Sequence, residues 1–182
     1  MPERASKVIA YIGIGSNVDP IENIPRAIEI LARETDILAV STFYRTEALG
    51  RPGQPEFLNG VCRIATSLEP RPLKFGVLRS IERALGRVRS EDKYAPRPID
   101  LDILLYGEAI REEDDLRIPD PEIRTRPFVA VPLLELAPDA ALPDTGERIA
   151  DLSAAQKRDT LRADCVFTRG IRKRLGHEPE PR

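Results

Sequence analysis

The order in which apolar patterns follow one another constrains the fold of this 182-residue chain most strongly. Runs rich in β-branched residues, typical of strands, alternate with apolar stripes at helical spacing. Asp19 and Pro20 supply the start of the first helix, and Gly86 ends the second. The expected elements are a strand at 7–14, a helix at 20–34, strands at 36–46 and 57–68, a helix at 69–85 and a strand at 99–105. This β-α-β-β-α-β order predicts a ferredoxin-like α+β sheet with helices packed on it.

The rest of the chain is less regular. Residues 47–56 are rich in Gly and Pro and indicate a loop long enough to bind a ligand, and a polar segment at 87–97 precedes the last strand. Residues 128–139 contain a short apolar element between prolines. Beyond it the sequence becomes polar and basic. We therefore expect one domain at 1–155 and a polar, partly disordered, solvated tail at 156–182.

Composition excludes several functions. Charged residues make up 32% of the chain but the net charge is −2, which does not fit the basic surface of a nucleic-acid-binding protein. No apolar run approaches membrane-spanning length and no secretory leader is visible, so we expect no membrane partner and a cytoplasmic location. Nothing indicates an obligate protein partner. Cys62 and Cys165 lack metal or redox spacing, and the single histidine, His177, lies at the extreme C-terminus, which argues against Ser/His and Cys/His hydrolases.

The stretch "KYAPRPIDLDILLYG" places two carboxylates in an otherwise apolar strand. Side chains of a strand alternate between its two faces, so the apolar residues that recur with a period of two are expected on one face. These are Ile99, Leu101, Ile103 and Leu105. Asp100 and Asp102 then share the other face. Two adjacent like charges need a counter-ion, so a divalent metal site is one interpretation. A solvated strand face neutralised by neighbouring arginines is the other.

Arginines surround this strand in the sequence. Arg87, Arg89 and Arg97 precede it, and Arg124 and Arg126 lie in a later loop that could fold over the same edge. Guanidinium groups match phosphate oxygens, and a carboxylate pair can hold magnesium while phosphates complete its coordination. Together these residues predict a nucleoside triphosphate site. A network of surface ion pairs is the alternative.

Other nucleotide-binding folds fit less well. The chain has no G-x-x-x-x-G-K-[ST] motif, and "GIGSN" lacks the third glycine of a dinucleotide fingerprint. A magnesium-dependent nucleotidyltransferase also uses an Asp-x-Asp strand, with a Gly-Ser pair shortly before it. Here Gly15 and Ser16 lie far upstream of Asp100, which weakens that alternative.

With these residues in place, "KYAPRPIDLDIL" resembles the signature of the 6-hydroxymethyl-7,8-dihydropterin pyrophosphokinase family. The stretches "AYIGIGSN", "FYRTEALG", "QPEFLNG", "LGRVR" and "RPFVAVPLLELAPD" extend the resemblance over about residues 9–145, in the same order. The resemblance implies a ferredoxin-like α/β/α sandwich around a mainly antiparallel sheet. It also implies a magnesium- and ATP-dependent diphosphokinase of folate biosynthesis, which transfers diphosphate from ATP to the pterin hydroxymethyl group and releases AMP.

The resemblance further implies a role for individual residues. Asp100 and Asp102 would hold two magnesium ions, and Arg87 and Arg97 would be catalytic with them. The implied pterin contacts are Thr46, Leu49, Phe57, Asn59 and Phe128, with the two phenylalanines stacking on the ring. The implied nucleotide contacts are Glu82, Arg87, Arg89, Tyr94, Arg97, Ile103 and Arg126.

Two positions depart from the family pattern. Asp120 stands where many members have a phosphate-contacting histidine, and Ser90 stands where some have a lysine. Both changes remove positive charge from the nucleotide side, so a pterin- or nucleotide-binding domain without catalysis is an alternative. Because a carboxylate near a phosphate is repelled, we expect Asp120 to pair with Arg117, Arg124 or Arg126. Binding to a water held by magnesium is the alternative.

Overall fold

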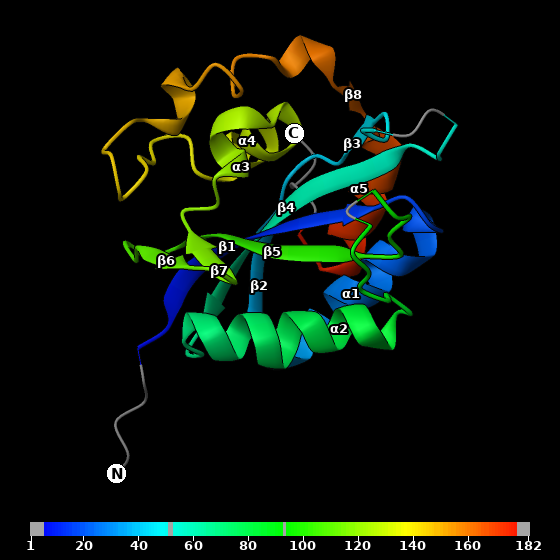
Figure 1. Cartoon of the computed structure of the whole chain (residues 1–182), viewed down its shortest axis with the longest axis horizontal. Coiled ribbons are helices and arrows are strands. Elements are labelled where there is room, and N and C mark those ends of the chain that lie inside the picture. Colours follow the sequence, from blue (N-terminus) through cyan, green and yellow to red (C-terminus); the bar gives the residue numbers. More distant parts are fainter. Residues whose placement is uncertain (1–5, 51–52, 93, 178–182) are drawn as a thin grey trace.

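An antiparallel sheet forms the centre of the molecule in the computed structural model, which describes residues 6–50, 53–92 and 94–177 (Figure 1). β1 pairs with β4 on one side and β5 on the other, and β3 and β8 continue the sheet beyond β4. β2 pairs with the far end of β4. The strands are β1 (Val8–Ser16), β2 (Asp36–Val40), β3 (Tyr44–Thr46), β4 (Phe57–Thr66), β5 (Asp100–Tyr106) and β8 (Arg162–Ala163).

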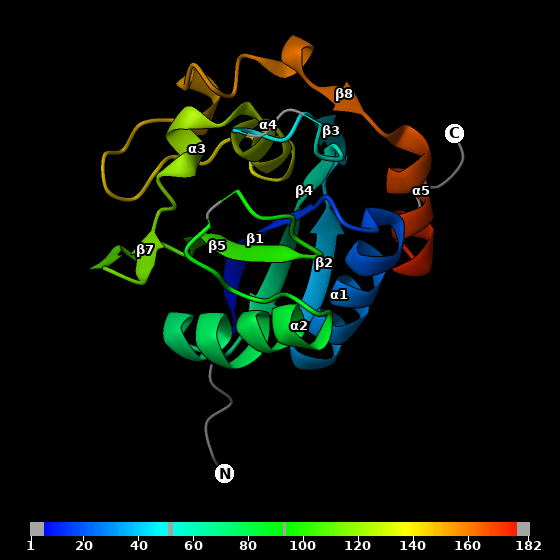
Figure 2. The same ribbon diagram turned by 45° about the vertical axis from the view of Figure 1, so that its right-hand side comes forward.

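Helices cover both faces of this sheet (Figures 1 and 2). One face carries α1 (Pro20–Glu34), the π-helix η1 (Pro72–Leu78), its continuation α2 (Arg79–Ala84) and α5 (Cys165–Arg174). The opposite side carries α3 (Glu122–Thr125), α4 (Pro127–Leu136) and the 3-10 turns η2 (Ile149–Asp151) and η3 (Arg158–Thr160). The predicted α+β class with a mainly antiparallel sheet is confirmed. No helix in the described ranges is long and apolar enough to cross a membrane.

The sheet separates two apolar cores, and β5 contributes to both. Leu101 and Ile103 pack in the core on the α1 side, whereas Leu104 packs in the core on the α4 side. A register shift in the pairing of β5 with β1 places Leu105 in the α4-side core, so the prediction that it shares a face with Ile103 was wrong. Strand alternation therefore directs Asp100 and Asp102 to the α4 side.

The strand predicted at 36–46 is interrupted between β2 and β3. At the break, the main-chain N–H of Thr42 donates to the Glu135 carboxylate at 2.8 Å, and that of Phe43 donates to the Thr168 hydroxyl at 2.9 Å. Glu135 belongs to α4 and Thr168 to α5. The single-strand prediction was wrong because these distant side chains replace strand partners, which local spacing does not reveal.

The C-terminal segment up to residue 177 folds onto the sheet, which corrects the prediction of a solvated tail for this part of the chain. The last five residues of the predicted tail, 178–182, lie outside the described residues. β8 pairs with β3, and the main-chain N–H of Asp164 donates to the Phe43 carbonyl at 2.8 Å. The Asp164 carboxylate accepts the Phe167 N–H at 3.0 Å and caps α5. α5 buries Thr168 and Ile171. A polar composition concealed this packing because a short helix needs only one apolar stripe to dock.

A two-stranded hairpin, β6 (Arg111–Glu113) and β7 (Leu116–Ile118), follows β5. After it, the main-chain N–H of Asp120 donates to the Leu104 carbonyl at 2.9 Å. This bond holds Asp120 against β5, on the side of the strand away from β1. The hairpin thus returns the chain to the strand that carries the paired aspartates.

Candidate active site

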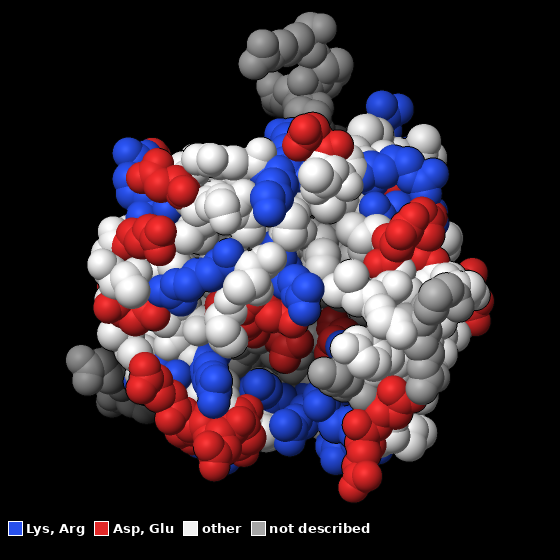
Figure 3. Space-filling model, turned by 45° about the horizontal axis from the view of Figure 1, so that its top comes forward, with Lys and Arg blue, Asp and Glu red and all other residues white. Residues whose placement is uncertain are grey.

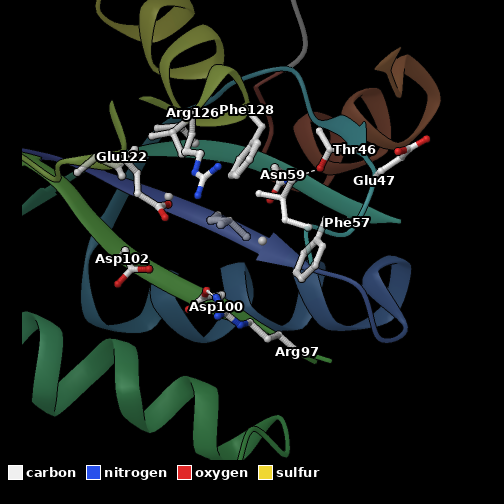
Figure 4. A pocket seen from close by; sticks show the side chains of 18 of the residues that line it. Thr46, Glu47, Phe57, Asn59, Arg97, Asp100, Asp102, Glu122, Arg126 and Phe128 are labelled. Carbon is white, nitrogen blue, oxygen red and sulfur yellow. Dashed lines mark hydrogen bonds and ion pairs between the residues drawn. The ribbon is translucent and has the colours of Figure 1, made fainter. Parts of the chain in front are cut away.

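A cavity of about 300 Å³ lies between the strands β1, β4 and β5 and the helices α3 and α4 (Figure 4). The space-filling view shows acidic side chains in a hollow bordered by basic ones (Figure 3). The cavity brings together most of the predicted site residues. Those that line it are Thr46, Leu49, Phe57, Asn59, Tyr94, Arg97, Asp100, Asp102, Arg126 and Phe128.

The end of the cavity between β4 and α4 presents two phenylalanine rings and the Asn59 amide, with Glu47 and Arg126 beside them (Figure 4). Asn59 donates from Nδ2 to the Thr46 hydroxyl at 2.9 Å. Its Oδ1 lies so close to Gly15 that a Cβ there would meet it at 2.8 Å, so glycine is needed for this approach. Phe57 and Phe128 point into the cavity from different elements (Figure 4). A flat heteroaromatic ring fits this arrangement because it can stack on aromatic faces and bond at its edge.

The other end contains an ion-pair network around Asp100, the first residue of β5. Arg87 contacts one carboxylate oxygen of Asp100 and Arg97 contacts the other. Glu82 in α2, which is 2% exposed, accepts from Arg87 at 2.6 Å and from Arg89 at 2.7 Å. Burial alone would raise the pKa of Asp100, but Arg87 and Arg97 outweigh it and lower that pKa. Asp100 is therefore held ionised and in a fixed orientation.

Two predicted nucleotide contacts lie behind the cavity surface. Glu82 is buried beneath the arginines, so it acts on the site by holding Arg87 and Arg89. Ile103 is 2% exposed and its side chain packs in the core on the α1 side, which leaves only its main-chain atoms for a ligand. Arg89 itself is half exposed.

Asp102 lies in a different electrostatic environment from Asp100. Within the described residues its one ion pair is with Lys74, whose Nζ is 3.9 Å from Oδ1. The Asp102 side chain is 41% exposed. The pKa of Asp102 is raised above its ordinary value. Partial burial is the largest cause, and the negative charges of Asp100 and Asp120 follow. Negative charge is therefore in excess around Asp102.

The prediction that Asp120 pairs with an arginine was wrong. Arg124 bonds to Asp144 at 2.8 Å, and in the described part of the chain no arginine forms an ion pair with Asp120. The Asp120 carboxylate instead accepts the main-chain N–H of Glu122 at 2.8 Å, the local bond by which aspartate often stabilises a turn. Burial raises the pKa of Asp120. Asp120 thus adds a third carboxylate near Asp102.

The oxygen ligands of Asp100 and Asp102 fit magnesium. Each oxygen of Asp100 can accept a further contact besides its arginine, and Asp102 has excess negative charge around it. Among the described residues, no three acidic, histidine or cysteine side chains form a complete metal cage. A cation held by two carboxylates and completed by phosphate oxygens and water is the arrangement that magnesium prefers. The site therefore suits a metal that binds together with a polyphosphate.

The side chains that join the loops around the cavity were not among the predicted site residues. Asn17 accepts the main-chain N–H of Arg97 at 2.7 Å and donates to Gln54 at 3.3 Å. Gln54 in turn donates to the Tyr94 carbonyl at 2.9 Å. An asparagine directly after a strand often bonds loop backbone, so "GSN" was a usable signal for Asn17. No sequence signal identified Gln54, or Glu122, which also lines the cavity.

Known proteins share this sequence pattern. Residues 11–138 match the family model for 7,8-dihydro-6-hydroxymethylpterin-pyrophosphokinase. The chain is 42% identical over 148 residues to the 2-amino-4-hydroxy-6-hydroxymethyldihydropteridine pyrophosphokinase of Pseudomonas aeruginosa, which spans 80% of this chain and 90% of that protein. A protein of the same name from Synechocystis sp. is 40% identical over 146 residues, covering 79% of this chain and 73% of the relative.

Solved structures share the fold at low sequence identity. A structure described as HPPK-DHPS in complex with substrates has a TM-score of 0.62 and 13% identity, and the match covers 84% of this chain and 43% of that one. Wild-type HPPK-DHPS from Plasmodium falciparum has a TM-score of 0.64 at 12% identity, covering 97% and 47%. The chain thus spans a little under half of these longer proteins. The family model and the sequence relatives show that the chain belongs to the 7,8-dihydro-6-hydroxymethylpterin-pyrophosphokinase family.

Proposed function

We propose that the cavity joins a pterin site to a nucleotide and magnesium site, so that the hydroxyl group of one substrate meets the phosphates of the other. The chain is an ATP-dependent diphosphokinase of folate biosynthesis, which transfers diphosphate from ATP to the hydroxymethyl group of 6-hydroxymethyl-7,8-dihydropterin and releases AMP. One observation carries the division of the site. Phe57, Phe128 and Asn59 line one end of the cavity, while Asp100 and Asp102 line the other.

At the pterin end, the hydrogen bonding of Asn59 sets what the pocket can recognise. Its Nδ2 is committed to Thr46, so its Oδ1 remains to accept from an N–H at the edge of the pterin ring. Phe57 and Phe128 supply the faces on which the ring stacks. Main-chain groups of Thr46 and Leu49 complete the contacts.

At the nucleotide end, arginines stabilise the negative charge of the transferring group. Arg97 and Arg126 line the cavity, and Glu82 fixes Arg87 and Arg89 behind them. Fixed guanidinium groups stabilise phosphoryl oxygens without reorganising during the reaction. Two magnesium ions held by Asp100 and Asp102 would neutralise the phosphates further. Tyr94 and the main chain of Ile103 contact the nucleoside.

The reaction follows from bringing the two ends together. The pterin hydroxyl loses its proton as its oxygen attacks the β-phosphorus of ATP in line, and the bond from that phosphorus to the α-phosphate oxygen breaks, so that AMP leaves. Positioning supplies much of the rate, because both substrates are held in one cavity. The loops joined by Asn17 and Gln54 border that cavity and limit the access of water.

Measurement of AMP release by chromatography tests this function. AMP should form from ATP when the pterin and magnesium are both present, and omission of either should abolish it. Release of pyrophosphate in place of AMP would indicate a nucleotidyltransferase. Binding of pterin and a non-hydrolysable ATP analogue without AMP release would indicate a binding domain without catalysis. Neither alternative is favoured by the family relationship.

A further inference from the structure

Lys74 lies in an unusual structural context for a lysine. It belongs to the π-helix η1, in which the Arg79 N–H donates to the Lys74 carbonyl five residues earlier. Such helical irregularities occur frequently at functional sites. The Lys74 side chain is only 17% exposed, although lysine is rarely buried without a partner. Its partner is Asp102, a proposed magnesium ligand, with Nζ 3.9 Å from Oδ1.

Other basic side chains near Lys74 are engaged elsewhere. The arginines closest to the aspartate pair contact Asp100. Arg71 and Arg79, on the same helical segment as Lys74, lie over the Phe75 ring at 4.7 and 4.2 Å from its centre. Arg71 also pairs with acidic residues of the β6–β7 hairpin. Lys74 is therefore the one cation within ion-pair distance of Asp102 in the described part of the chain.

The Lys74 ammonium attracts two carboxylates, those of Asp102 and Asp120. Burial raises the pKa of both carboxyl groups, and the Lys74 ammonium opposes that shift in both. The bond from the Asp120 N–H to Leu104 holds Asp120 beside β5, two residues along the strand from Asp102. Two carboxylates and one ammonium leave a net negative charge at this position.

We propose that Lys74 is a positioning residue for the metal: its ammonium is the counter-ion that a divalent cation must displace from Asp102, so metal binding depends on the nucleotide. The proposal rests on the assignment of Asp102 as a metal ligand. A divalent cation beside an ammonium is repelled, which weakens the binding of metal alone. Nucleotide phosphates attract both cations and reduce this repulsion. Metal and nucleotide then bind cooperatively, and each strengthens the other by the same factor.

Binding of Mn²⁺ to the enzyme, followed by electron paramagnetic resonance without turnover, tests the proposal. Lys74→Met keeps an unbranched side chain but removes the charge, whereas Lys74→Arg keeps the charge. Lys74→Met should bind Mn²⁺ alone about tenfold more tightly, and a non-hydrolysable ATP analogue should then enhance Mn²⁺ binding about tenfold less than in the unaltered chain. Lys74→Arg should behave like the unaltered chain.

The control is Lys173→Met, which changes an exposed lysine of α5 and should leave Mn²⁺ binding unaltered. A disturbed fold would not produce tighter Mn²⁺ binding by Lys74→Met, because damage to the site weakens metal binding. Unchanged or weaker Mn²⁺ binding by Lys74→Met, with a normal circular dichroism spectrum, would overturn the proposal. If Lys74→Met does not fold, Lys74→Gln provides the same test.

Asp102→Asn separates failure of this proposal from failure of the metal assignment. If Asp102→Asn binds Mn²⁺ as well as the unaltered chain does, Asp102 is not a metal ligand and the basis of the proposal is removed. If Asp102→Asn loses Mn²⁺ binding while Lys74→Met fails to strengthen it, the metal site stands and the role of Lys74 is wrong.

Discussion

The two ends of the cavity differ in how fully their polar groups are satisfied by the protein itself. At the pterin end, the Asn59 amide is bonded to Thr46 and lies between two phenylalanine rings. At the nucleotide end, Asp102 and Asp120 both have raised pKa values because burial and neighbouring carboxylates disfavour their charged forms. The first end is preorganised by the bond from Asn59 to Thr46, which leaves the Asn59 Oδ1 to accept from a ligand. The second retains unfavourable electrostatic energy that a bound cation can relieve.

The largest effect should come from removing a carboxylate at the nucleotide end. Asp100→Asn or Asp102→Asn should each reduce kcat at least about 10²-fold, because the metal loses a ligand and the phosphates lose charge compensation. Steady-state kinetics with saturating magnesium would measure this. Asp139→Asn, which changes an exposed aspartate outside the site, is the control. Near-normal turnover in either site variant would show that the metal site has been misassigned.

A smaller effect should distinguish Arg97 from Asp120. Arg97→Ala should reduce kcat/KM for ATP by distinctly more than about tenfold, since Arg97 both contacts Asp100 and lines the cavity. Asp120→Ala should change it by less than about tenfold, because the Asp120 carboxylate bonds the Glu122 backbone. If Asp120→Ala proves as damaging as Asp102→Asn, Asp120 belongs to the metal machinery.

The pterin end should respond independently. Phe128→Ala should weaken pterin binding by roughly 1 kcal/mol or more through loss of a stacking face. Calorimetry with a non-hydrolysable ATP analogue already bound would measure it without interference from binding order. Affinity for that analogue should stay the same, because no charged group changes. Unaltered pterin affinity would mean that Phe128 serves only the α4-side core, against which it packs.

The smallest effect concerns stability in the absence of metal. Because the pKa of Asp102 is raised, the folded protein retains a proton that the unfolded chain has lost, and stability falls as pH rises from the ordinary carboxyl pKa through the raised one. Asp102→Asn should therefore be more stable than the unaltered chain at pH 8. The gain should be about 1 kcal/mol or less, since the 41% exposed side chain is screened by solvent.

Urea unfolding with EDTA at pH 8 and near pH 4 tests this expectation. The difference between Asp102→Asn and the unaltered chain should shrink at the lower pH, where the Asp102 carboxyl group is protonated in the folded protein and already partly protonated in the unfolded chain. A variant that is less stable at pH 8, or a difference that does not depend on pH, would remove the argument for electrostatic strain at Asp102.

Much of the central sheet could be predicted from sequence because its information is local. The paired aspartates on one face of β5 and the helical stripe of α1 follow from the periods of strands and helices. The same alternation brought Asp100 and Asp102 together in the structure. The assignment of Phe57 and Phe128 to the pterin pocket depended on the family resemblance, because phenylalanines at these positions could equally have been core residues.

Contacts between distant segments were beyond local patterns. The break in the strand at 36–46 depends on Glu135 and Thr168, which come from helices far along the chain. The position of Lys74 depends on a π-helical turn that an apolar stripe does not distinguish from an ordinary helix. An arginine partner for Asp120 was predicted because three arginines are close in sequence. In the structure the turn instead places the Glu122 N–H where it donates to the Asp120 carboxylate.

A crystal structure with Mn²⁺, a non-hydrolysable ATP analogue and the pterin, in which anomalous scattering locates the metal, tests both ends of the cavity at once. Mn²⁺ should be bound by carboxylate oxygens of Asp100 and Asp102 and by phosphate oxygens, and the pterin ring should lie between Phe57 and Phe128. Metal bound away from both aspartates, or a pterin outside the two phenylalanines, would contradict the proposed site.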